Sequence, residues 1–240
     1  MNLLAFDTST DTLSIAVAHG PALWQHSGPG AAQSSATLIP AIQHLLQEAG
    51  LTLEQLDAIV FGRGPGSFTG LRTACAIAQG LALGAGGGRG LPVLPVDTLM
   101  AVAEEARQQY GCTQIVATLD ARMNEVYHGH YQWQDATWQM PQDFGLCAPE
   151  AVPVPPGWTV AGNAQAAYGP RLAPQAAHAV AWPTATALLR LAPALLAAGA
   201  GVPASQALPR YVRDKVAKTT AEREAERAAP QAAHHTSTQP

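Results

Sequence analysis

Charged residues are scarce in this chain, since Asp, Glu, Lys and Arg together make up only 12% of its 240 residues. The formal net charge is −4, and 48% of the residues are hydrophobic. Proteins that bind nucleic acid on their own normally present a basic face, so this composition argues against that class. It allows a sizeable core in one large domain or two lobes, and it indicates that part of the surface meets something other than water.

Cysteine is also rare, and long apolar runs are missing. The first seven residues lack the basic region of a signal peptide. The longest apolar run, residues 185–200, contains Arg190 and Pro193, so no membrane span is predicted. A sparse, odd number of cysteines without metal-ligand spacing is typical of a reducing compartment, and they are Cys75, Cys112 and Cys147. We therefore expect a cytoplasmic protein without membrane contact.

Glycines gather in one stretch, Gly62–Arg72, with the sequence GRGPGSFTGLR. It follows an apolar run at residues 58–61 that is typical of a buried strand, and it precedes residues 69–83, which predict a helix. Ser67 or Thr69 is expected to cap that helix. A glycine loop before a helix can bind phosphate, but the spacing matches neither the P-loop nor the dinucleotide-binding pattern. The pattern favours a structural turn over a phosphate cradle.

The N-terminal segment predicts two strands, residues 2–6 and 13–18, joined by the polar turn Asp7–Thr12, and Trp24 is expected on a third strand. An acid followed by hydroxyl side chains in a hairpin is how actin-like and sugar-kinase-like folds approach a nucleotide phosphate. The same side chains could instead bind the backbone of the turn. Both interpretations stay open. The possible nucleotide or interface loop comprises Asp7, Thr8, Ser9, Thr10, Gly64, Gly66, Ser67, Thr69 and Arg72.

Two helices of the first half carry regular small or apolar faces. Residues 33–50 place Leu38, Ile42 and Leu45 on one face, and the helix at residues 69–83 repeats alanine every four positions from Ala74. Such faces are expected to pack closely, within the fold or against another subunit. Further strands are expected at residues 91–96, 114–119, 127–133, 137–140 and 159–161, and further helices at residues 97–110 and 184–198.

We expect three parts along the chain. Residues 1–110 form a first lobe with the partner-binding helices, residues 111–215 form a second lobe, and Arg210–Arg213 closes the fold. The glycine-rich residues 84–90 predict a surface loop. Residues 216–240 have too little apolar material for a core and predict a disordered tail, with a transient helix at residues 221–228.

Titratable residues follow the first strand of the second lobe. Asp120, Arg122 and Glu125 are expected either to form a salt bridge in a turn or to line the cleft between the lobes. His128 and His130 lie two residues apart on a strand and hence on one face, where they could seed a metal site. The flanking tyrosines favour an exposed, half-aromatic strand face instead.

Four motifs resemble those of the TsaB (YeaZ) family of bacterial proteins. They are Asp7-Thr8-Ser9-Thr10, Gly62–Arg72, Asp120-Ala121-Arg122 with Glu125-Val126-Tyr127 and, more weakly, Arg210–Arg213. The resemblance spans roughly residues 1–216 and implies an α/β, actin-like (ASKHA, ribonuclease H-like) fold of two lobes. It also implies a role in making threonylcarbamoyladenosine, the modified base beside the anticodon in tRNAs that read codons beginning with A.

The resemblance further implies a non-catalytic platform subunit. Proteins of this family bind the TsaD subunit, which holds metal and transfers the threonylcarbamoyl group, together with the TsaE ATPase. They also form homodimers through the same helices. ATP or ADP and metal are expected on those partners, with no cofactor on this chain, and tRNA is reached only through the complex.

The first helix supports this non-catalytic interpretation. TsaD-like proteins carry a His-x-x-x-His metal pair there, whereas this chain offers only His44, with Ser34 near the position of a single histidine in TsaB relatives. One histidine without a second ligand cannot hold a catalytic metal. We therefore expect neither catalytic nor metal-binding residues.

The expected interface lies on the first-lobe helices. The residues expected to contact the TsaD-like partner or a second copy are Leu38, Ile42, Leu45, Leu71, Ala74, Cys75, Ala78 and Leu81. A bulky charged residue in place of Ala78 is expected to abolish pairing and leave the monomer folded. Arg63, Arg72 and Arg122 could contact tRNA or the partner. The alternative function is a stand-alone nucleotide-binding hydrolase or glycoprotease-like enzyme, although Ser67 has no histidine and acid near it in sequence.

Overall fold

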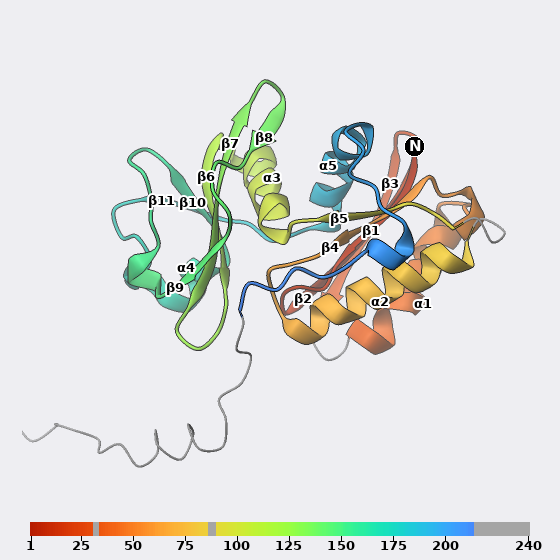
Figure 1. Cartoon of the computed structure of the whole chain (residues 1–240), viewed down its shortest axis with the longest axis horizontal. Coiled ribbons are helices and arrows are strands. Elements are labelled where there is room, and N and C mark those ends of the chain that lie inside the picture. The colour runs from red at the N-terminus through yellow and green to blue at the C-terminus, as the bar shows by residue number, and fades with distance from the viewer. Residues whose placement is uncertain (31–33, 86–89, 214–240) are drawn as a thin grey trace, which may run out of the picture.

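The structure, a computed structural model, describes residues 1–30, 34–85 and 90–213. Two β-sheets with helices packed on their faces give the molecule two lobes (Figure 1). The prediction of a two-lobed α/β fold is confirmed. The predicted tail at residues 216–240, with its transient helix, and most of the loop at residues 84–90 lie outside the described residues.

The first sheet contains five strands in the order β3-β2-β1-β4-β5. β1, β2 and β3 pair antiparallel, as the predicted hairpin requires, and β4 and β5 run parallel to β1. Side chains alternate between the faces of a strand, so Leu4 and Phe6 of β1 join one core cluster and Leu3 and Ala5 join another. The bounds are β1 Asn2–Asp7, β2 Thr12–His19, β3 Ala22–Pro29, β4 Ala58–Gly62 and β5 Val93–Val96.

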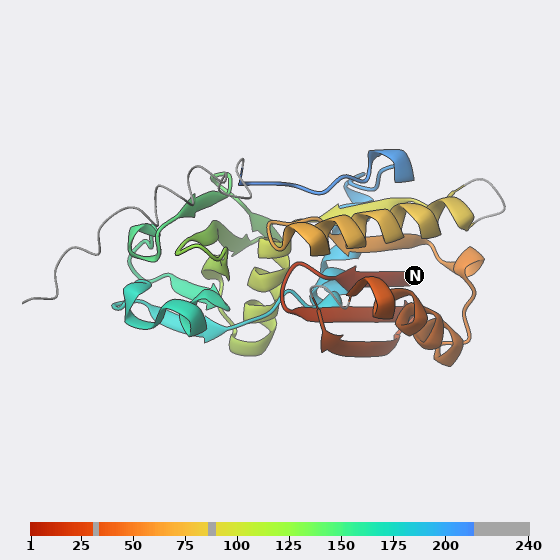
Figure 2. The ribbon, with the colours of Figure 1, turned by 90° about the horizontal axis from the view of Figure 1, so that it is seen from below.

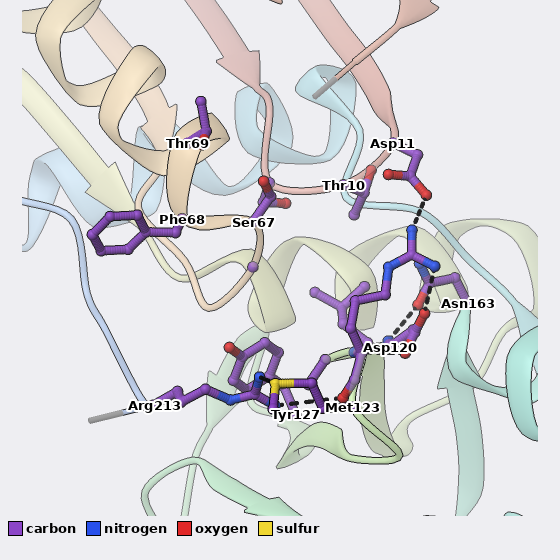
Figure 3. A pocket seen from close by; sticks show the side chains of 15 residues that line it. Thr10, Asp11, Ser67, Phe68, Thr69, Asp120, Met123, Tyr127, Asn163 and Arg213 are labelled. Carbon is purple, nitrogen blue, oxygen red and sulfur yellow. Dashed lines mark hydrogen bonds and ion pairs between the residues drawn. The ribbon is translucent and has the colours of Figure 1, made fainter. Parts of the chain in front are cut away.

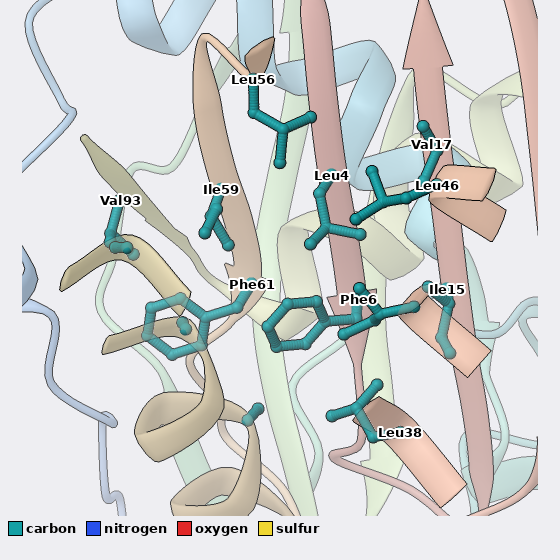
Figure 4. Packing of buried hydrophobic residues seen from close by; sticks show 14 of the residues in the cluster. Leu4, Phe6, Ile15, Val17, Leu38, Leu46, Leu56, Ile59, Phe61 and Val93 are labelled. Atoms are coloured by element: carbon teal, nitrogen blue, oxygen red, sulfur yellow. The ribbon is translucent and has the colours of Figure 1, made fainter. Parts of the chain in front are cut away.

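Helices cover both faces of this sheet. α1 (Ser34–Glu48) and α2 (Phe68–Gly84) pack on one face, and α5 (Ala185–Ala197) packs on the other (Figures 1 and 2). Figure 4 shows the layer beneath α1 and α2, where Leu38 lies among Phe6 and Ile15 of the sheet. Burying each such side chain stabilises the fold by roughly 1.5–3 kcal/mol.

The position of α5 corrects the predicted division of the chain. Its residues were expected in the second lobe, but Ala185, Leu188 and Ala192 share a core cluster with Ala16 and Val60 of the first sheet. Every residue of β4 is buried, so the central strands are apolar on both faces and both faces need a layer of helices. The periodicity of a helix does not show which sheet the helix covers.

The second sheet contains six strands. Five follow the order β11-β10-β6-β7-β8, and the sixth, β9, also pairs with β7. α3 (Thr98–Tyr110), expected in the first lobe, packs on this sheet instead, where Leu99 and Val102 share a cluster with Ile115 and Tyr131. α3 also contacts α5 and so connects the lobes. The bounds are β6 Gln114–Asp120, β7 Val126–Gln134, β8 Thr137–Gln139, β9 Gly145–Cys147, β10 Thr159–Gly162 and β11 Ala177–Val180.

The predicted strands and helices are confirmed within a few residues, and two short strands and one short α-helix were not predicted. These are β9, β11 and α4 (Ala164–Tyr168), which are only three to five residues long. Such lengths are too short to show a helical or strand period in the sequence. None of the helices in the described ranges has the length and apolar character that crossing a membrane requires.

Candidate functional site

A cavity of about 370 Å³ lies between the lobes (Figure 3). The turn after β1 and the loop before α2 line it from the first lobe, and the loop after β6 lines it from the second. The predicted residues in its wall are Ser9, Thr10, Gly66, Ser67, Thr69, Asp120 and Arg122. The predicted residues outside its wall are Asp7, Thr8, Gly64, Arg72 and Glu125. The motifs therefore identify the loops of the cleft, but only part of its lining.

The glycines of the central loop let the N-terminal turn approach α2. Ser67 caps α2, because its Oγ accepts from Gly70 N at 3.4 Å, and its own N–H donates to the Ser9 carbonyl at 2.7 Å. A Cβ on Gly70 would lie 1.9 Å from the Thr8 carbonyl oxygen, and one on Gly66 would lie 2.5 Å from that of Ser9. Only glycine fits at these two positions, which supports the interpretation of the loop as a structural turn.

Asp7 is completely buried and binds the turn. Its Oδ1 accepts from Ser9 N at 2.8 Å and Ser9 Oγ at 2.6 Å, and its Oδ2 accepts from Thr98 Oγ1 at 3.3 Å. Burial raises the pKa of Asp7 from 3.8 to about 6, and these hydrogen bonds offset only part of that increase. Of the two interpretations of Asp7, these contacts favour the one in which the side chain binds the turn, because its carboxylate faces protein and not the cleft.

An ion-pair network crosses the mouth of the cleft. Arg122 of the second lobe binds Asp11 of the first lobe, and its Nη1 lies 3.1 Å from Asp120 Oδ2 (Figure 3). The predicted turn salt bridge between Asp120 and Arg122 is thus present, and both residues also line the cavity. Glu125 binds Arg213 instead.

Three consecutive residues in the loop after β6 have left-handed backbones, with φ of 60° at Arg122, 55° at Met123 and 62° at Asn124. Residues other than glycine rarely adopt this backbone conformation, and three of them in a row mark a locally strained turn. The sequence offered no signal for it beyond Asn124, which tolerates the left-handed region better than most residues. The turn points the side chains of Arg122 and Met123 at the cavity.

The segment from residue 203 to residue 213, here called the C-terminal strap, contacts both lobes. On the first lobe, the Ala207 carbonyl accepts from Cys75 Sγ at 2.9 Å, and Arg210 N donates to the Arg63 carbonyl at 2.7 Å. On the second lobe, Arg213 binds Glu125, and Arg210 binds Asp143. The expectation that Arg210–Arg213 closes the fold agrees with these contacts.

The side chains expected at the partner interface lie in the core instead. Seven of the eight are buried, with 0% to 6% of their surface exposed, and the eighth, Leu81, is half-buried. The seven are Leu38, Ile42, Leu45, Leu71, Ala74, Cys75 and Ala78. The apolar stripe of an amphipathic helix faces its own sheet, so the regular spacing marked the inner face. Ala78 is fully buried, so the expected outcome changes, and a charged side chain there should disrupt the monomer itself.

The opposite side of the two helices is exposed. We call this surface the outer helix face, and it comprises Ile39, Pro40, Gln43, Arg72, Ala76, Gly80 and Leu83. Among these seven residues only Arg72 is charged, while on the same exposed side of α1 Glu48 lies 3.7 Å from His44 Nε2. A groove of about 350 Å³ beside it is lined by residues of both helices, including Ile39, Leu46 and Leu81. A partner could therefore bury this face without removing many charges from water.

The two histidines of β7 are less exposed than predicted. His130 is buried, and its Nε2 lies 2.8 Å from the Pro153 carbonyl oxygen. Burial lowers the pKa of His128, whose ring lies 6.1 Å from that of His130. Among the described residues, no three His, Cys, Asp or Glu side chains gather in a way that could hold a metal ion.

Comparison with known proteins identifies the family. The model of the family described as "TsaD: tRNA N6-adenosine threonylcarbamoyltransferase" matches residues 29–221. The chain is 34% identical over 228 residues to the Escherichia coli K12 protein named tRNA threonylcarbamoyladenosine biosynthesis protein TsaB, covering 90% of this chain and 96% of that one. It is 43% identical over 127 residues to the Haemophilus influenzae protein of the same name, covering 53% and 52%.

The solved structures agree with the sequence relatives. The structure titled "YeaZ from Pseudomonas aeruginosa" matches with a TM-score of 0.80 and 39% identity, over 88% of this chain and 99% of that one. A second solved structure from the same species, titled as an uncharacterized protein with similarity to peptidase YEAZ, matches with a TM-score of 0.81 and 38% identity over the same shares. The two lobes therefore form an actin-like fold, and the chain belongs to the TsaB (YeaZ) family.

Proposed function

We propose that this chain is the non-catalytic platform subunit of a complex that makes threonylcarbamoyladenosine in tRNA. It binds a TsaD-like catalytic subunit through the outer helix face, and a TsaE-like ATPase joins the pair. ATP or ADP and metal belong to those partners, and tRNA is reached through the complex. The names of the relatives support the pathway, since the Escherichia coli and Haemophilus influenzae proteins are both called tRNA threonylcarbamoyladenosine biosynthesis protein TsaB.

One observation carries the proposal: the outer helix face presents apolar side chains to solvent with almost no charge. Ile39 is 41% exposed and Leu83 is 65% exposed, although burial of such side chains is favourable. Ala76 and Gly80 leave room for a second helix to approach α2 closely. Helices of a partner would cover this face, and in the absence of that partner a second copy offers the same surface, as a two-fold symmetric homodimer requires.

The interior of the cleft supports a non-catalytic role. A general acid or base must reach the proton that it transfers, and Asp7 is enclosed by Ser9, Thr98 and the backbone of Gly62. Arg122 is held by two carboxylates. The carboxylates and the guanidinium named here thus bind other groups of the protein, as expected of a scaffold that keeps two lobes in a fixed relation.

The test is to replace Ala76 on the outer helix face with arginine. Ala194, an exposed alanine of α5 on the other side of the sheet, gives the matched control variant. We expect Ala76→Arg to weaken pairing with the TsaD-like protein of the same organism about tenfold or more, while Ala194→Arg pairs normally. Equal pairing of Ala76→Arg and the unaltered chain would contradict the proposal. Circular dichroism of each variant checks that the monomer is folded.

A second candidate function rests on the cavity itself. Its wall contains the N-terminus of α2 and Ser67, whose hydroxyl accepts from Gly70 N and keeps its own proton to donate, a combination that can bind phosphate. Calorimetric titration of the chain alone with ATP separates the two candidates. The platform proposal expects no binding, whereas binding that Ser67→Ala abolishes would favour a nucleotide-binding protein.

A further inference from the structure

Arg72 stands out on the outer helix face because aromatic side chains hold it in place. Its guanidinium carbon lies 3.9 Å from the centroid of the Phe68 ring, one turn earlier on α2. Its Nε donates to the hydroxyl of Tyr211 at 3.2 Å, and the rings of Phe68 and Tyr211 lie 5.1 Å apart. Tyr211 belongs to the C-terminal strap and is 46% exposed. Two separate segments of the chain thus order one exposed cation.

The neighbouring arginines differ from Arg72 in their charge partners. Arg63 binds Asp97, Arg122 binds Asp11, and Arg210 and Arg213 bind Asp143 and Glu125. Within residues 1–30, 34–85 and 90–213, no carboxylate forms an ion pair with Arg72. Its charge is therefore uncompensated in the described part of the chain, while each arginine around it is paired.

The geometry leaves the carboxylate-binding edge of Arg72 open. A guanidinium has five N–H donors, and only the Nε–H is used by Tyr211. The two Nη groups remain for a bidentate pair with a carboxylate, the geometry that arginine forms best. Because Phe68 and Tyr211 already restrict the side chain, less conformational entropy is lost when such a pair forms.

We propose that Arg72 anchors the interface at the outer helix face by forming an ion pair with an aspartate or glutamate side chain of the partner subunit. The inference rests on the proposed function and adds the chemistry by which the partner is recognised. The surface favours a protein carboxylate over RNA, since phosphate-driven binding needs several uncompensated cations and, among the arginines that the structure describes, only Arg72 lacks a charge partner. Arginine and tyrosine are also the side chains most often found at the energetic centres of protein interfaces.

The experiment is isothermal titration of the TsaD-like protein of the same organism into the full chain and its variants, at 50 and 300 mM salt. Arg72→Ala is expected to weaken binding about 30-fold or more, and Arg72→Glu to weaken it further. Tyr211→Phe keeps the ring but loses the hydrogen bond, so an intermediate loss is expected. Arg171→Ala is the matched control, because Arg171 is an exposed arginine of the second lobe that binds Glu150, and no change is expected. The salt dependence of binding should shrink in Arg72→Ala.

The outcomes separate this inference from the proposed function. If Ala76→Arg abolishes pairing while Arg72→Ala pairs like the unaltered chain, the proposed function is supported and the ion-pairing role of Arg72 is refuted. If the unaltered chain does not bind the TsaD-like protein, both are refuted. If Arg72→Ala keeps protein pairing but the assembled complex loses tRNA binding, then Arg72 binds RNA and the proposed carboxylate is wrong.

Discussion

Replacing Asp7 with asparagine should stabilise the protein at neutral pH, although Asp7 belongs to a motif of the family. The carboxylate is fully buried and its hydrogen bonds come from neutral groups, namely the Ser9 N–H and the hydroxyls of Ser9 and Thr98. Asparagine can keep this arrangement, because its Oδ1 accepts from Ser9 and its Nδ2 can donate to the Thr98 oxygen. The change therefore removes a buried charge while keeping the shape.

The size of the expected gain in stability follows from the pKa of Asp7 in the folded protein. A rise from 3.8 to about 6 means that the ionised Asp7 costs about 3 kcal/mol of stability at pH 7. Between pH 3.8 and about 6 the unfolded chain loses this proton first, so stability from this group falls as pH rises through that window. Below pH 3.8 both states are protonated and the cost disappears. Asp7→Asn should thus gain up to about 3 kcal/mol at pH 7 and little at pH 3.5.

Urea unfolding at a series of pH values measures this difference. Other groups titrate in the same range, so the free energy of unfolding of the variant minus that of the unaltered chain is the quantity to follow. Asp135→Asn, at an exposed turn, should show no comparable gain. An Asp7→Asn variant that is less stable at pH 7, or whose gain does not depend on pH, would refute the assignment of Asp7 as a buried carboxylate whose charge destabilises the fold.

Two further changes test packing, one within the first lobe and one between the two lobes. Gly70→Ala should cost about 3 kcal/mol in urea unfolding because its Cβ would lie 1.9 Å from the Thr8 carbonyl oxygen, whereas Gly80→Ala on the open face of the same helix should cost nothing; equal stabilities would contradict the close approach. Arg190→Ala should cost about 2 kcal/mol, because Arg190 of α5 binds the α3 acids Glu104 and Glu105. Burial alone would raise the pKa of Glu104, but hydrogen bonds from Arg107, Trp138 and Arg190 hold this pKa below its ordinary value. The stability lost in Arg190→Ala should therefore shrink in acid, as Glu104 becomes protonated. A loss that does not vary with pH would contradict that role.

The sequence predicts the elements of this fold well because their patterns are local. The apolar run before Gly62 and the alanine repeat after it depend on neighbouring residues only, and both appear where expected as β4 and α2. The assignment of helices to lobes fails for α3 and α5, since that assignment depends on which sheet face remains uncovered after the chain has folded.

The site is predicted less completely, and for a related reason. The periodicity of Leu38 and Ala78 identifies a helix face, but the same pattern fits a face that meets the protein's own sheet or another subunit. The structure assigns it to the sheet, so the exposed residues between these positions become the candidates. The role of Tyr211 beside Arg72 could not be predicted, because 139 residues separate them in sequence and only the strap brings them together.

The central claim is that the outer helix face pairs this chain with a TsaD-like subunit. Light scattering of the chain alone and mixed in equal amounts with the TsaD-like protein of the same organism tests it most directly. We expect a homodimer that exchanges into a heterodimer with one copy of each chain. A chain whose mass does not change in the mixture would contradict it.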